Sequence, residues 1–72
     1  MDSEIQLEIL DVLESNGTTA LTRLCRLLEF PELEITAALG QLVTKRYVKR
    51  SGHNFKITAS GKAHLADVRN TE

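Results

Sequence analysis

The sequence has few of the residues that several classes of protein depend on. It contains one cysteine, one proline and no tryptophan, and its aromatic content is only 4%. A single cysteine cannot form a disulfide within the chain, so the fold must be stabilised by apolar packing and a reducing compartment is expected. With so few aromatic rings the chain has little to stack on unpaired bases, which argues against recognition of single-stranded nucleic acid.

Long apolar runs are also absent. The sequence has no stretch of about 18 apolar residues, and no basic start leads into an apolar segment of the kind that directs secretion. We therefore expect a soluble, cytoplasmic protein with no membrane association. The 72 residues, 42% hydrophobic and 26% charged, have the balance of one globular domain. This domain is expected to span residues 1–72, with an ordered core of about residues 3–69.

Groups that carry enzyme chemistry are equally sparse. His53 falls in a predicted turn and His64 in the last predicted helix, and neither has a cysteine or carboxylate at the spacing of metal ligands. No glycine-rich phosphate loop follows a strand, and no serine, histidine and aspartate set is indicated. Cys25 has the apolar spacing of a small core residue. We therefore predict no enzymatic activity, no bound metal and no cofactor.

The net charge of −1 hides an uneven distribution. Residues 1–30 carry six acidic and two basic residues, whereas residues 31–72 carry seven basic and four acidic residues. Six of the nine Lys and Arg residues lie between Lys45 and Lys62, where no acidic residue occurs. Such a segment is typical of a surface that binds a polyanion, and the alternative is chance clustering on a solvated surface.

Apolar residues at helical spacing predict a first helix over about residues 3–15. Ser3 and Gln6 have the spacing of a capping box at its start. Leu7 and Leu10 fall roughly opposite the main apolar face, which indicates a second apolar surface. We predict that this surface forms a homodimer interface, and the residues assigned to it are Leu7, Leu10, Leu65 and Val68.

Two further helices and a hairpin are predicted after Gly17. The second helix covers Ala20–Glu29 and is expected to be capped by the hydroxyls of Thr18 and Thr19. The third covers Glu32–Lys45 and has an apolar stripe at 3.6-residue spacing. The next residues alternate between apolar and basic, which predicts a two-stranded hairpin with strands Tyr47–Arg50 and Phe55–Ile57 and a turn over Ser51–Asn54. A fourth helix, Ala59–Arg69, is expected to begin with Thr58 as its cap.

Three segments of the sequence resemble the winged helix-turn-helix family. Residues 17–25 (GTTALTRLC) are similar to the family's entry into its second helix. Residues 38–50 (ALGQLVTKRYVKR) are similar to the end of its third helix and the first strand of its wing. Its return strand and the Thr-x-x-Gly helix start of MarR-like and PadR-like regulators resemble residues 55–61 (FKITASG). The resemblance covers about residues 3–68 and implies a mainly α fold with a small β-hairpin: three helices, a two-stranded wing and a C-terminal helix.

The resemblance implies binding to double-stranded DNA, as a small dimeric transcriptional regulator. The third helix would enter the major groove, and the hairpin would lie along the backbone or in the minor groove. The residues assigned to DNA contact on this basis are Thr36, Gln41, Thr44, Lys45, Arg46, Lys49, Arg50, His53, Asn54 and Lys56. Most would contact phosphate, so the affinity should depend steeply on salt.

Two features depart from the family pattern. The family commonly has glycine at the corner between the third helix and the wing, where this chain has Arg46. Either Arg46 takes the bend at a steric cost, or the turn is built differently. The outward face of the third helix is also poor in side chains that read bases, since only Gln41 and Lys45 qualify. The same face could instead pack against a protein helix through Leu33, Thr36, Ala37 and Gly40. The alternative is therefore a winged-helix adaptor that binds a protein partner through its third helix.

Overall fold

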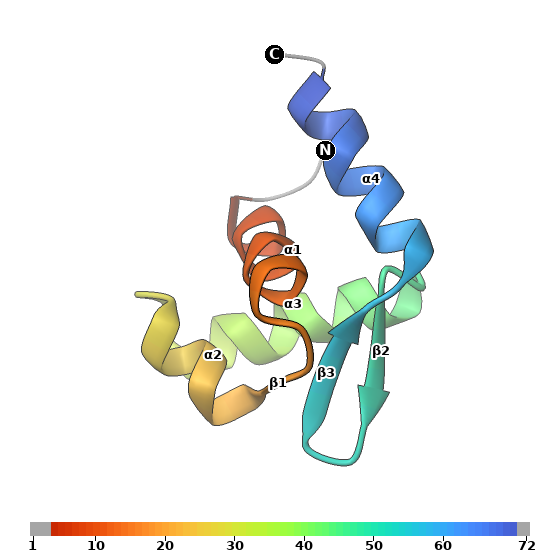
Figure 1. The fold of residues 1–72 in the computed structure, drawn as a ribbon. Coiled ribbons are helices and arrows are strands. Elements are labelled where there is room, and N and C mark those ends of the chain that lie inside the picture. Colours follow the sequence, from red (N-terminus) through yellow and green to blue (C-terminus); the bar gives the residue numbers. More distant parts are fainter. Residues whose placement is uncertain (1–3, 71–72) are drawn as a thin grey trace.

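The computed structural model describes residues 4–70, which form four helices and a three-stranded antiparallel sheet (Figure 1). This is the mainly helical fold with a hairpin that the sequence predicts. None of the helices within residues 4–70 is long and apolar enough to cross a membrane. The elements, in chain order, are α1 (Glu4–Asn16), β1 (Thr19–Ala20), α2 (Leu21–Leu27), α3 (Glu32–Thr44), β2 (Val48–Ser51), β3 (Asn54–Ile57) and α4 (Ala59–Asn70).

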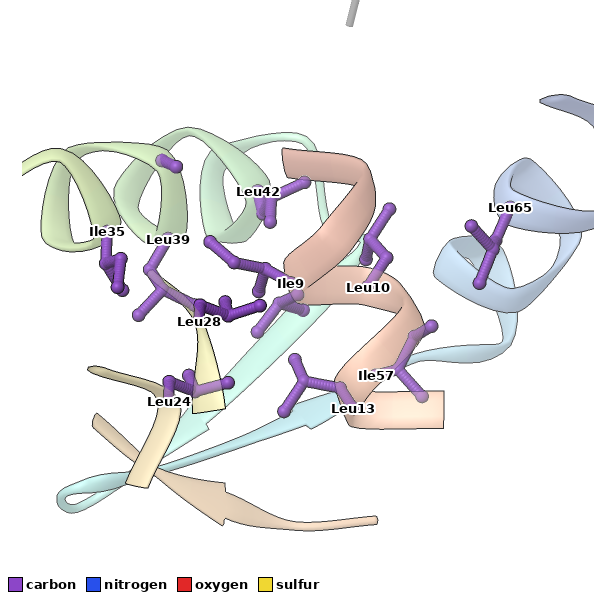
Figure 2. Packing of buried hydrophobic residues seen from close by; sticks show 12 residues of the cluster. Ile9, Leu10, Leu13, Leu24, Leu28, Ile35, Leu39, Leu42, Ile57 and Leu65 are labelled. Carbon is purple, nitrogen blue, oxygen red and sulfur yellow. The ribbon is translucent and has the colours of Figure 1, made fainter. Parts of the chain in front are cut away.

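The core is centred on α1, which packs between α3 and α4 (Figure 2). Ile9 and Leu13 of α1 are fully buried, as are Leu24 of α2 and Ile35 of α3. Burying an aliphatic side chain of this size contributes about 1.5–3 kcal/mol relative to leaving it in water. The stripes of α1 and α3 therefore supply much of the stability of this small domain. The predicted capping box at the start of α1 involves Ser3, which lies outside the described residues.

The second apolar face of α1 is covered by α4 of the same chain. Leu10 and Leu65 are only 1% and 3% exposed and belong to the main core. Both were assigned to a dimer interface, but in this fold they have almost no surface left for a partner. Leu7 and Val68 are half-buried beside them and remain accessible. Leu65 lies 55 positions after Leu10 in the chain, so the local pattern of α1 could not show that α4 covers this face.

The sheet contains a short strand that the sequence analysis missed. Thr19 and Ala20 form β1, which pairs with Phe55 and Asn54 of β3, so the order in the sheet is β1-β3-β2. The prediction that Thr18 and Thr19 cap α2 is therefore wrong. Ala20 is the N-cap residue and makes no side-chain cap, while the Thr19 hydroxyl donates to the Gly17 carbonyl at 2.9 Å. Pairing with β3 holds this segment extended, so α2 begins only at Leu21.

The corner between α3 and the hairpin is built on Arg46, which has a φ of 66°. It is the one non-glycine residue with positive φ in the part of the chain that the structure describes. The Tyr47 amide donates to the Leu42 carbonyl at 2.9 Å, and the Thr58 hydroxyl donates to the Arg46 carbonyl at 2.7 Å. These bonds hold the left-handed turn. Of the two alternatives, Arg46 therefore takes the bend itself, in place of the family's glycine.

Replacing Arg46 by glycine is expected to raise the free energy of unfolding by about 1 kcal/mol. A left-handed conformation costs an ordinary residue about 1–2 kcal/mol, and the greater chain entropy of unfolded glycine offsets part of the gain. The measurement is urea unfolding followed by circular dichroism. Arg46→Ala is the matched control, because it removes the same charge but keeps the strained conformation. An equal gain in both variants would show that charge, rather than backbone strain, is the cause.

The start of α4 follows the predicted Thr-x-x-Gly pattern. The Gly61 amide donates to the Thr58 hydroxyl at 3.0 Å, so the prediction that Thr58 caps this helix is confirmed. The Thr58 amide also donates to the Tyr47 carbonyl at 3.0 Å. Gly61 is buried, and a Cβ on it would meet that same carbonyl oxygen and lie 2.8 Å from Ile57 Cγ1. Through these contacts, Thr58 and Gly61 connect the end of the hairpin and the start of α4 to the corner after α3.

Candidate nucleic-acid interface

The outward face of α3 carries no charged side chain over its central turns. Its exposed residues are Leu33, Thr36, Ala37, Gly40, Gln41 and Thr44, as the sequence predicts. The Thr44 hydroxyl donates to the Gly40 carbonyl at 2.9 Å, so it is turned towards its own helix. Gly40 has no atom within 4 Å of where its Cβ would lie, so nothing in the fold requires glycine there. The central turns of this face therefore present mostly small, uncharged side chains.

Gln41 is held by α1. Its side-chain carbonyl accepts a hydrogen bond from the side-chain amide of Gln6, which is 5% exposed. Recognition of an adenine edge uses both the donor and the acceptor of a glutamine side chain, so this bond would have to break first. Local sequence gives no sign of the pairing because the two residues are 35 positions apart. Gln41, which was predicted to read bases, is therefore exposed but already hydrogen-bonded within the protein.

The hairpin, which we call the wing, carries basic side chains on both of its faces. Val48 and Ile57 are paired and buried, and side chains alternate along each strand. Lys49 and Lys56 are therefore paired on the solvent face. Arg50, paired with Phe55, lies on the face that turns towards α3.

Arg50 is also oriented by the turn of the wing. Its Nε donates to the Gly52 carbonyl at 3.1 Å, across the two-residue connection of Gly52 and His53. The His53 and Asn54 side chains are exposed at the tip. The His53 carbonyl accepts from the Leu21 amide at 3.4 Å, which ties the tip to the start of α2. The wing is thus anchored at its tip as well as at its base.

Charge runs along α3 from acidic to basic. Glu32 and Glu34 are exposed in its first turn, and Lys45 and Arg46 are exposed at its end. Lys45 is the C-cap residue of the helix. The basic end therefore lies next to the wing, whereas the acidic end would repel phosphate. Seven of the predicted contacts are exposed at the end of α3 or on the wing: Lys45, Arg46, Lys49, Arg50, His53, Asn54 and Lys56.

A groove lies between α3 and the wing. It has a volume of about 220 Å³ and is lined by Leu21, Leu39, Val43 and Phe55, with Gly40 and Thr36 on the α3 side. Arg50 is the charged residue on its wall. The sequence analysis did not find this groove, because its wall combines residues from α2, α3 and the wing. The exposed glycine at position 40 was the signal that could have indicated it.

The remaining predicted surface, between α1 and α4, is acidic. Leu7 and Val68 line a shallow depression together with Glu4, Glu8 and Asp11. Arg69 of α4 forms ion pairs with Asp11 and, at 2.9 Å, with Glu14. His64 of α4 stacks on Tyr47, with ring centroids 4.4 Å apart, so it is packed at the base of the wing rather than fully solvated. Within residues 4–70 no group of three His, Cys, Asp or Glu side chains is placed to hold a metal ion.

The fold and this basic region define a helix-turn-helix protein with a wing. In α2 and α3 the chain has the paired helices of the motif, and β2 and β3 supply the wing. A family model for the winged helix DNA-binding domain matches residues 3–61, and the chain belongs to this family. The MarR-like or PadR-like subtype stays a prediction. Neither the curated proteins nor the solved structures gave a match to the chain.

Proposed function

We propose that this protein binds double-stranded DNA through its wing and the basic end of α3, and acts as a small transcriptional regulator. The observation that carries the proposal is the presence of basic side chains on both wing faces. Lys49 and Lys56 occupy one face and Arg50 the other, within a family of DNA-binding domains. A hairpin with charge on both faces suits a minor groove, where it meets a phosphate backbone on each side.

Contacts to phosphate are expected to supply most of the affinity. Base recognition in the major groove relies on Arg, Lys, Asn or Gln aimed at base edges. The centre of the outward face of α3 has Thr36, Ala37 and Gly40, and Gln41 is bonded to Gln6. Thr36 and Thr44 can contact phosphate or a thymine methyl group, which gives little discrimination. The proposed mode is therefore binding with modest sequence preference.

The test is a titration of mixed-sequence duplex DNA over a range of salt concentrations. Each neutralised phosphate contributes about −0.9 to the slope of log affinity against log salt. With four to six contacts, the affinity should fall by about 100- to 1,000-fold between about 50 and 200 mM salt. Unrelated duplexes should differ by less than about ten-fold. Absence of binding at the lowest salt, or a slope near zero, would refute the proposal.

Homodimerisation through α1 and α4 remains a prediction. A single winged-helix domain covers a small DNA site, so two copies would bind more firmly. Leu7 and Val68 are the accessible apolar residues of that surface, and Glu4 and Glu8 border them. Two identical copies facing each other there would bring carboxylates together, which opposes the association.

Protein binding through α3 is the second candidate function. One observation favours it: Leu33 is 82% exposed, on a helix face with few groups that could read DNA. A large apolar side chain displayed in this way on a helix is typical of a contact with another protein.

A further inference from the structure

Leu33 is the most exposed large apolar side chain in the part of the chain that the structure describes. It is 82% exposed, compared with 46% for Leu27. Leu33 has Glu32 and Glu34 as chain neighbours, so it is an apolar side chain bordered by carboxylates. A binding surface that matches it needs an apolar recess with a basic residue at its edge. The protein itself has such a recess.

The groove between α3 and the wing has these properties. Its walls are mainly apolar, and Arg50 is the charged residue on them. Gly40 lines the groove, is exposed, and has no intrachain neighbour within 4 Å of a Cβ position. Glycine is unfavourable inside a helix, so a position where the fold does not require it points to close approach by another molecule.

The charges along α3 favour an antiparallel partner helix of the same sequence. Glu32 and Glu34 occupy the N-terminal turn, and Lys45 and Arg46 follow the C-terminal turn. Two such helices side by side in opposite directions place acidic ends against basic ends and pair their helix dipoles favourably. Glu34 and Lys45 lie on the same side of α3. With Ala37 opposite Gly40, Glu34 comes near Lys45 of the partner helix, and Leu33 lies beside the last turn of that helix, next to its groove.

We infer that α3 is an interface between two copies of this chain. The helices pack antiparallel about a two-fold axis near Gly40, and Leu33 of each copy enters the groove between α3 and the wing of the other copy. The contact is isologous, so one surface patch supplies both sides of the interface. The shortness of α3 makes this a small interface and a reversible, concentration-dependent dimer. It covers the proposed DNA surface, so the α3-paired dimer and the DNA complex exclude each other.

The first experiment measures molar mass without DNA over a range of protein concentrations. The wild type is expected to shift from monomer to dimer, and Leu33→Lys should weaken the association by about ten-fold or more. Gly40→Gln should weaken association as well, although it improves the helix. The matched control is Leu27→Lys on α2, at the other exposed leucine, which should leave the mass unchanged. Leu7→Lys separates this interface from the one predicted through α1 and α4. A wild type that stays monomeric, or a loss of dimer with Leu7→Lys but not with Leu33→Lys, would overturn the inference.

The second experiment exchanges the charges of the two helix ends. Glu32→Lys/Glu34→Lys and Lys45→Glu/Arg46→Glu should each abolish self-association, because like charges then meet at both ends of the pair. An equimolar mixture of the two variants should form a heterodimer, since every end again faces an opposite charge. Failure of the mixture to associate would overturn the antiparallel arrangement. Because no DNA is present, the result is independent of whether the DNA proposal holds.

Discussion

Gly61→Ala is expected to destabilise the domain by about 3 kcal/mol, at the upper end of the usual cost of forcing extra volume into a packed site. The added Cβ would meet the backbone carbonyl of Tyr47 and lie 2.8 Å from Ile57 Cγ1. That carbonyl also accepts from the Thr58 amide, so it cannot move without breaking the junction between the wing and α4. A domain of this size has roughly 3–5 kcal/mol of stability, so the variant should be largely unfolded.

Urea unfolding followed by circular dichroism measures this effect. Gly40→Ala is the matched control, because it is the same substitution in a helix at a position with free space around the Cβ. This control should raise the free energy of unfolding by about 1 kcal/mol, the usual helix preference of alanine over glycine. A lower free energy of unfolding for Gly61→Ala together with a higher one for Gly40→Ala would show that close contact, rather than helix propensity, causes the loss at Gly61. A stable Gly61→Ala protein would mean that α4 packs differently from the arrangement described.

Lys49→Gln/Arg50→Gln is expected to lower the affinity for duplex DNA by about 100-fold at about 50 mM salt, from the loss of two phosphate contacts. The dependence of log affinity on log salt should become less steep by about two. The two side chains lie on opposite faces of the wing, so each single substitution should account for a part of the loss. Both residues are exposed, and stability should change little.

The control for net charge is Ala63→Glu/Ala66→Glu. It changes the charge of the protein by the same amount, at exposed positions on α4, which leads away from the wing (Figure 1). Its effect on DNA affinity should be less than about three-fold, because charges beyond about 10 Å are largely screened at moderate salt. Equal losses in both variants would indicate a general charge effect and would contradict a specific role of the wing.

Several features of the fold were predictable from short stretches of sequence. Helical spacing of apolar residues located α1, α2 and α3 to within one or two residues at most ends. The Thr58 cap was read from a four-residue pattern, and a bend at Arg46 was one of two alternatives raised by the resemblance to a family with glycine at that corner. These signals are local, because caps, turns and amphipathic faces depend on neighbours within a few positions of the chain.

The features that the sequence analysis missed all depend on distant pairs. Thr19 became a strand because it meets Phe55, and Leu10 became core because α4 returns to cover it. Gln41 is exposed, but its side-chain carbonyl is bonded to Gln6, so it is not free to read a base.

The sequence by itself determined the helices, the wing and the basic segment of this protein. Tertiary structure decided which faces those residues occupy: Arg50 on the side of α3, the lysines on the other side, and Leu33 left in solvent. The physical reason is that local patterns fix the conformation of a segment, whereas exposure and partners are set by contacts between segments that the chain brings together only on folding.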